Sequence, residues 1–137
     1  MQIDGRGVPI GVAVAGANVH DQRLVRATLD SIPVQRPRPM RRKRQHLCLD
    51  KGYVGEPVQQ LVRRRHYIPH VPVKFGETTQ PKHRHGKARR WKVERTHSWL
   101  NRARRLLIRW EKKAKNYLAF LHLACAYITL RAAKVLG

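Results

Sequence analysis

Acidic residues are scarce in this chain, which has 8 Asp plus Glu against 30 Lys plus Arg and a formal net charge of +22 over 137 residues. The bases are spread along the whole length and do not form a single basic tail. Such a charge favours a polyanionic partner, with nucleic acid as the first candidate; an acidic membrane and simple solubility are the alternatives. Hydrophobic residues still make up 42% of the chain, so we expect a folded basic domain.

Cysteine and long apolar runs are scarce too. Cys48 and Cys125 are the two cysteines, and both lie in apolar runs without a CxxC pair, so we expect buried thiols in a reducing compartment and no disulfide or zinc framework. The longest apolar stretch, residues 117–130, is interrupted by His122 and is shorter than the ~20 residues of a membrane span. The N-terminus has no signal-peptide pattern. We therefore expect a cytoplasmic protein with no membrane contact.

The first predicted elements are a hairpin turn at residues 4–7 and a strand over residues 8–15. Asp-Gly-Arg-Gly is a turn sequence, and the residues after it are rich in Val, Ile and Ala. Only three residues precede the turn, so the incoming strand is nearly absent. We therefore expect the chain to begin inside a sheet, without an N-terminal portion.

A helix is predicted to begin at a cap, Asn18 or Asp21, and to end at Pro33. Residues 33–44 are Pro-rich and then strongly basic, which indicates an exposed loop. Solvation of these bases and contact with phosphate are equally consistent with this pattern.

The apolar run at residues 47–49 predicts a strand that delivers Asp50 into a glycine-bearing turn. Residues 56–65 follow as a helix with a basic last turn. Residues 67–73 contain β-forming residues and two prolines, which allows an edge strand at best.

Residues 74–87 are polar and are predicted to form a loop. His83 and His85 within it could ligate a metal, but without a third ligand nearby a basic loop is the favoured interpretation. A long helix is predicted from residue 88 to about residue 109. Its predicted core face consists of Thr96, Trp99, Leu100, Ala103, Leu106, Leu107 and Trp110. A second helix over residues 117–135 is apolar nearly all round, which favours burial against the first.

The predicted order is strand, helix, strand, helix, strand, helix, helix, which is typical of an α/β fold. The length suits one domain over residues 1–137. It would comprise strands and helices over 1–73, the loop over 74–87 and two C-terminal helices over 88–137.

Two of the acids lack an ordinary role in a turn, cap or helix dipole. Asp50 closes an apolar strand, and Glu94 lies inside the Arg-rich helix, one turn after Arg90. Two carboxylates on so basic a surface suit Mg²⁺ that meets phosphate, because Mg²⁺ is usually bound by one or two carboxylates plus substrate phosphates. Spacing alone favours the alternative, in which Asp50 caps a turn and Glu94 pairs with Arg90 or Arg95.

Three motifs, in this order, resemble the DDE transposases of bacterial insertion sequences, most closely the insertion-sequence-five type. They are Gly16-Ala-Asn-Val-His-Asp21, then Leu49-Asp-Lys-Gly-Tyr53, then Arg90-Trp-Lys-Val-Glu-Arg95 with Trp99-Leu100 and Arg104-Arg-Leu106. The resemblance runs from about residue 4 to residue 130. It implies a ribonuclease-H-like fold in which three acids bind two Mg²⁺ ions, cut DNA strands and join the freed 3′ hydroxyl to a target.

The resemblance assigns the family's second acid to Asp50 and its third to Glu94, both as metal ligands. It assigns the supporting arginine to Arg90, which would hold Glu94 or a phosphate by charge-assisted hydrogen bonds. The family often carries a base seven residues after the Glu, where this chain has Asn101 with Arg102 beside it.

The first acid of the family lies upstream of a turn like that at residues 4–7. We therefore expect the chain to lack both the first strand and the first catalytic Asp. Asp4 opens the turn and is rejected as a substitute. The expected protein is a DDE transposase fragment that is inactive on its own.

The expected partners are DNA, as transposon ends and target, and further copies of the chain in a synaptic complex. The bases expected to contact DNA are Arg41, Arg42, Lys43, Arg44, Lys51, Arg89, Arg95, Arg102 and Arg105. One alternative is a non-enzymatic basic nucleic-acid-binding protein. Another is a remnant that does not fold stably, because a sheet missing a strand exposes unpaired backbone.

Overall fold

The computed structural model describes residues 1–72 and 90–135. Its elements are β1 (Gln2–Ile3), β2 (Pro9–Gly11), α1 (Asp21–Asp30), β3 (Gln45–Cys48), the 3₁₀ helix η1 (Lys51–Tyr53), α2 (Glu56–Arg64), β4 (Tyr67–His70), α3 (Arg90–Asn101), α4 (Arg104–Leu107) and α5 (Ala114–Ala132). The mixed α/β order expected from the sequence is confirmed. The predicted loop with His83 and His85, and the base Arg89, lie outside the described residues.

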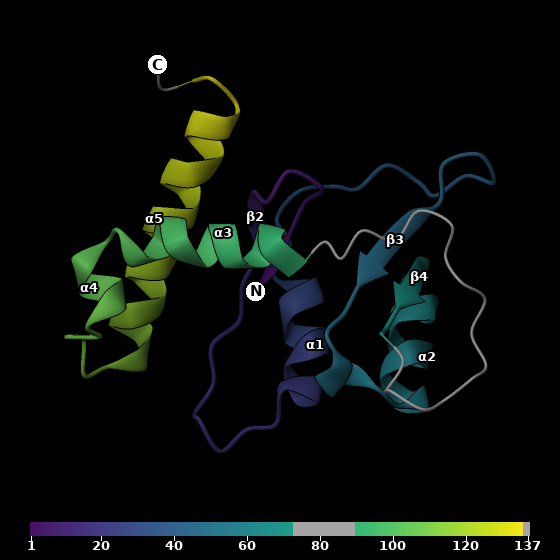
Figure 1. Ribbon diagram of the computed structural model, residues 1–137, viewed down its shortest axis with the longest axis horizontal. Helices are drawn as coiled ribbons and strands as arrows, with labels where there is room; N and C mark the ends of the chain where they lie inside the picture. Colours follow the sequence, from purple (N-terminus) through teal and green to yellow (C-terminus); the bar gives the residue numbers. More distant parts are fainter. Residues whose placement is uncertain (73–89, 136–137) are drawn as a thin grey trace.

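Helix α1 lies between the two halves of the molecule (Figure 1). On one side β3 and β4 form a parallel pair, with Gln45 opposite Tyr67, and α2 connects them. On the other side the antiparallel hairpin β1–β2 lies with α3, α4 and α5. The described residues thus form two separate two-stranded sheets, and the larger sheet that a ribonuclease-H-like fold implies is not visible in them.

The core of the first half is built from periodic apolar positions on α1 and α2. It contains Val25, Leu29, Leu47, Val58, Val62 and Tyr67, and Val62 is fully buried. The predicted helix over residues 56–65 is confirmed to within one residue. Pro57 stands in the first turn of α2, where its missing N–H costs no intrahelical bond, and two arginines stand in the last turn. The edge strand predicted over residues 67–73 is confirmed in part, because β4 covers only Tyr67–His70.

The core of the second half contains Leu100, Leu106 and Leu121. The single helix predicted over residues 88–109 is wrong, because the backbone turns extended at Ala103 and separates α3 from α4. This break buries Leu106 and leaves two members of the predicted core face, Leu107 and Trp110, exposed. The predicted packing of the last helix against the preceding one is confirmed by Leu121, which shares a buried cluster with Leu100, but only one face of α5 is covered, since Leu123 and Tyr127 are exposed.

Three smaller expectations also need correction. The strand after the hairpin turn covers only Pro9–Gly11. The cap of α1 is His20, whose Nδ1 accepts from the backbone N–H of Gln22 at 3.3 Å, and not Asn18 or Asp21. Cys48 is exposed, because residues of β3 alternate between faces and the described residues cover only the Leu47 face. No described helix is long and apolar enough to cross a membrane.

Candidate active site

Asp50 lies in the turn that joins β3 to η1. It is the N-cap of η1, and its Oδ1 accepts from the backbone N–H of Lys51 at 2.7 Å. The side chain is exposed, and Oδ2 makes no hydrogen bond to the part of the chain that the structure describes. The capping role that spacing alone favoured is therefore observed. It uses one carboxylate oxygen and leaves the other directed to solvent.

A side chain of α1 fixes this turn. The amide of Gln22 donates to the carbonyls of Gly52 at 2.9 Å and Val54 at 3.3 Å. The turn that carries Asp50 is thus tied to a helix 30 residues away in sequence. No local pattern predicts such a long-range contact, although Gln22 directly follows the Gly16–Asp21 motif.

The pKa of Tyr53, the last residue of η1, is affected by burial and by two acids, Asp21 on α1 and Asp50 in the turn. Partial burial raises the pKa of its hydroxyl, and the negative charges of Asp21 and Asp50 raise it further. Asp21 was explained from the sequence as a helix cap. Its negative charge also acts on the hydroxyl of Tyr53, as that of Asp50 does.

Glu94 lies on the exposed face of α3. His97, Ser98 and Asn101 follow it at spacings of three, four and seven residues and are also exposed. Arg90 is the first residue of α3, one turn before Glu94. Glu94 therefore belongs to a polar stripe that runs along the helix.

The opposite face of α3 contacts the hairpin turn. Lys92 Nζ donates to the carbonyl of Gly5, and the Arg95 guanidinium donates to the carbonyl of Arg6. The hydroxyl of Thr96, which is fully buried, donates to the carbonyl of Gly7 at 2.6 Å. Arg95 also lies over the rings of Trp91 and Trp99. Its side chain is half-buried and contacts other parts of the protein, whereas the sequence predicted an exposed side chain that contacts a DNA phosphate.

The other expected DNA contacts differ in how they are held. All four bases at residues 41–44 are exposed in the loop between α1 and β3, as are Lys51 and Arg102. Arg105 is exposed but pairs with Glu111 at 3.4 Å and lies over the ring of Phe120. Among the exposed bases expected to contact DNA, those at residues 41–44 and Lys51 are nearest to Asp50 in sequence.

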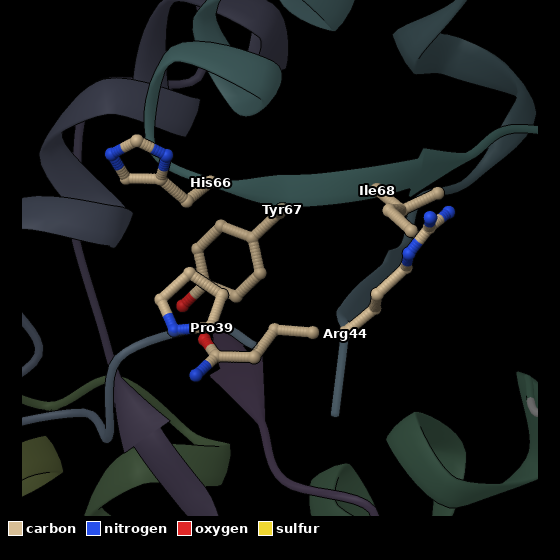
Figure 2. Close-up of a pocket in the computed structure, with 6 residues that line it drawn as sticks. Pro39, Arg44, His66, Tyr67 and Ile68 are labelled. Atoms are coloured by element: carbon tan, nitrogen blue, oxygen red, sulfur yellow. The ribbon is translucent and has the colours of Figure 1, made fainter. Parts of the chain in front are cut away.

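A pocket of about 290 Å³ lies beside β4 and contains neither acid. Figure 2 shows the ring of Tyr67 at its centre, between His66 and Pro39. The hydroxyl of Tyr67 is buried without a hydrogen-bond partner among the described residues. Arg36 stacks over the ring at 4.0 Å and donates to Gln45 at 2.7 Å. These contacts tie the basic loop to the parallel sheet, and we assign the pocket no role in the chemistry.

The two candidate ligands do not form a complete metal site by themselves. The described residues contain no group of three or more His, Cys, Asp or Glu side chains that could hold a metal ion. The donor type nevertheless fits Mg²⁺, because exposed carboxylate oxygens are hard ligands and Mg²⁺ normally completes its shell with water and phosphate. Each of the two carboxylates is thus a donor of the type that Mg²⁺ prefers.

The chain belongs to the DDE transposase family, since residues 1–129 match the family model described as Transposase DDE domain. A Burkholderia cepacia protein assigned as the transposase for insertion sequence element IS402 is 37% identical over 137 residues. The match covers 95% of this chain and 62% of that protein, so the chain spans less than two thirds of its relative. No solved structure matches. The family predicted from the three motifs is confirmed.

Proposed function

We propose that this chain forms part of the ribonuclease-H-like catalytic domain of an insertion-sequence transposase. The reaction class is phosphoryl transfer on DNA, first strand cleavage and then joining of the freed 3′ hydroxyl to a target. The family match over residues 1–129 supports this class. The strand order, with a parallel β3–β4 pair connected by α2, is compatible with such a domain.

The observation that carries the proposal is the way Asp50 is held. One oxygen is fixed by the N–H of Lys51, the turn is fixed by Gln22, and the second oxygen is left for a ligand. A carboxylate fixed in this way keeps its orientation when it binds a cation, so little ordering cost remains. Glu94 is the second ligand in this proposal, and Arg90 stands one turn before it.

Asp50 and Glu94 would hold Mg²⁺, whose bound form stabilises charge on a phosphate and activates an attacking oxygen. The surrounding bases bind and orient the DNA. Lys51 is adjacent to Asp50 and would hold a phosphate next to the acid, whereas the exposed bases at residues 41–44 precede β3 and would contact the DNA backbone at the other end of that strand. Transposon ends and target DNA are the proposed substrates, with further copies of the chain in the synaptic complex.

We further propose that the 137-residue chain does not cleave DNA by itself. Three acids hold the metal pair in the family, whereas two candidate ligands stand here and the described residues hold no three-ligand cluster. A poorly bound metal leaves the reacting groups misplaced, and misplacement is costly in rate.

The metal site can be tested by titrating the chain with Mn²⁺ and measuring free Mn²⁺ by electron paramagnetic resonance. We expect Asp50→Asn and Glu94→Gln each to weaken binding by about tenfold or more, because each removes a ligand. Asp30→Asn removes an exposed carboxylate remote in sequence from both acids and is the matched control. Equal Mn²⁺ affinity in all four proteins would overturn the proposed site.

A further inference from the structure

Three side chains of α3 hold three successive carbonyls of the hairpin turn. Lys92, Arg95 and Thr96 stand at spacings of three and four residues, so they share one face of the helix. They donate in order to the carbonyls of residues 5, 6 and 7. The turn therefore contacts α3 in a single register along the helix.

Gly7 makes this close approach feasible. Its φ of +87° is a left-handed conformation that favours glycine, and a Cβ there would meet Arg95 Nη2 at 3.0 Å. The same Cβ would also lie 3.4 Å from the carbonyl oxygen of Lys92 and from Thr96 Oγ1. The backbone of the turn thus rests directly on the helix, with no room for a side chain between them.

Thr96 is the most constrained of the three donors. It is 0% exposed, its hydroxyl lies 2.6 Å from the carbonyl oxygen of Gly7, and a second acceptor, the Lys92 carbonyl, is 2.9 Å away. Removing this hydroxyl would leave a buried carbonyl without its partner, which is costlier than losing an exposed hydrogen bond. Long, flexible side chains such as Lys92 can shift with less cost.

The docked face and the face that carries Glu94 are opposite sides of the same helix. Glu94 precedes Thr96 by two residues, or about 200° of helical rotation. Because a side-chain tip lies about 5–6 Å from the helix axis, rotating α3 by about 20° would move the Glu94 carboxylate by about 2 Å. A shift of that size is as long as a metal–oxygen bond.

We propose that Thr96 is a positioning residue for Glu94, and that the turn at residues 4–7 fixes the rotation and axial position of α3 through it. This inference rests on the proposed function, since it takes Glu94 to be a metal ligand. Thr96 touches neither the cation nor the DNA. It acts through the orientation of the helix, and Gly7 is its required partner.

The test uses the full 137-residue chain, ¹⁵N-labelled, with Mn²⁺ as the probe. Amide signals near a bound Mn²⁺ broaden, so the responses next to Asp50 and next to Glu94 are read separately. We expect Thr96→Val to need about tenfold more Mn²⁺ for the same broadening at Glu94 and, because the proposed ion is shared with Asp50, at Lys51 as well. Thr96→Ser keeps the hydroxyl and should restore the wild-type response.

Thr129→Val is the matched control. Thr129 also bonds a hairpin carbonyl, that of Pro9 at 3.4 Å, and its own preceding turn through Cys125 at 2.8 Å, but it stands on α5. It should respond to Mn²⁺ like the wild type. A loss in Thr129→Val equal to that in Thr96→Val would overturn the proposal, because any threonine-to-hairpin bond would then suffice.

The remaining outcomes separate two failures. A wild-type chain with no broadening at Glu94 would overturn both the proposed function and the role of Thr96. Normal wild-type broadening that Thr96→Val leaves unchanged, with a folded circular dichroism spectrum, would overturn the role of Thr96 alone. If Thr96→Val unfolds, Lys92→Met removes a different donor of the same contact and must also raise the Mn²⁺ concentration needed for broadening at Glu94; a wild-type response would overturn the proposal.

Discussion

Gly7 occupies a position where the backbone conformation and the available space both require glycine. Its φ is +87°, and a Cβ would be 3.0 Å from the Arg95 guanidinium. Gly5, two residues earlier in the same turn, has no left-handed φ, and a Cβ added there would meet nothing within 4 Å. The two glycines of one turn therefore differ in what they tolerate, although the sequence presents both as ordinary turn residues.

Gly7→Ala should lower the free energy of unfolding by about 1–3 kcal/mol, because alanine is strained at positive φ and crowds α3. Gly5→Ala should change it by less than about 0.5 kcal/mol. Urea denaturation of both variants measures the difference. Equal destabilisation would contradict the close approach of the turn to α3.

Asp30 responds to acid chiefly through Arg65, with a smaller contribution from the charge of Arg26. Its ion pair and hydrogen bond with Arg65 hold the pKa of the carboxyl below its ordinary value of 3.8. A carboxyl whose folded pKa is depressed contributes stability that is present above the unfolded value and is lost as pH falls through the folded pKa. This contribution should therefore disappear only in acid, below about pH 4.

Thermal unfolding between pH 6 and pH 2 checks this expectation. We expect Asp30→Asn to have a smaller acid-induced fall in Tm than the wild type, and Arg65→Gln to match it. The double variant should behave like either single variant, because both remove the same pair. If Tm falls in acid by the same amount in Asp30→Asn as in the wild type, the Asp30–Arg65 pair does not contribute to the pH dependence of stability.

At the scale of elements, local periodicity predicted α1 and α2 well. Val58 and Val62 stand one turn apart, so the apolar face of α2 is visible in the sequence itself. The division between α3 and α4 was not predicted, because the apolar spacing continues through Ala103 and only packing of Leu106 with Leu121 in one cluster favours the break. Tertiary contacts here override a continuous pattern.

The candidate site, like the helices, could be predicted from the sequence only in part. Asp50 and Glu94 could be proposed from short motifs, because a strand-end acid and a helical acid leave local patterns. The groups that hold them could not. Gln22 reaches the turn from 30 residues away, and Thr96 reaches Gly7 from 89 residues away. Chain folding creates such contacts, and no local pattern encodes them.

Val62 tests whether α2 is anchored as the structure describes. It is 0% exposed, so Val62→Ala should cost about 2 kcal/mol of unfolding free energy, as the sum of lost burial and residual cavity. Val34→Ala is the control, since Val34 is 65% exposed and should change stability by less than about 0.5 kcal/mol. Comparable costs for the two variants would contradict the assigned core.

At the scale of the whole molecule, DNA binding and catalysis would depend on residues of opposite charge. A net charge of +22 would supply affinity for DNA without any ordered metal site. Catalysis needs the carboxylates that this charge surrounds, and they number far fewer than the bases. Binding and cleavage should therefore be separable in this protein.

A plasmid assay tests that separation. With Mg²⁺, the purified chain should retard supercoiled DNA on a gel at low salt, lose that binding as salt rises, and yield no nicked product. Asp50→Ala should bind DNA as the wild type does. Nicking by the wild-type chain that Asp50→Ala abolishes would contradict the expected inactivity and would identify Asp50 as catalytic.

Whether Asp50 and Glu94 share one cation is tested most directly by Mn²⁺-induced broadening at Glu94 with and without the Asp50 carboxylate. In the wild-type chain we expect amide signals next to both acids to broaden over the same range of Mn²⁺ concentration. In Asp50→Asn the broadening at Glu94 should disappear at those concentrations, because the cation loses its second ligand. Unchanged broadening at Glu94 in Asp50→Asn would contradict a shared site.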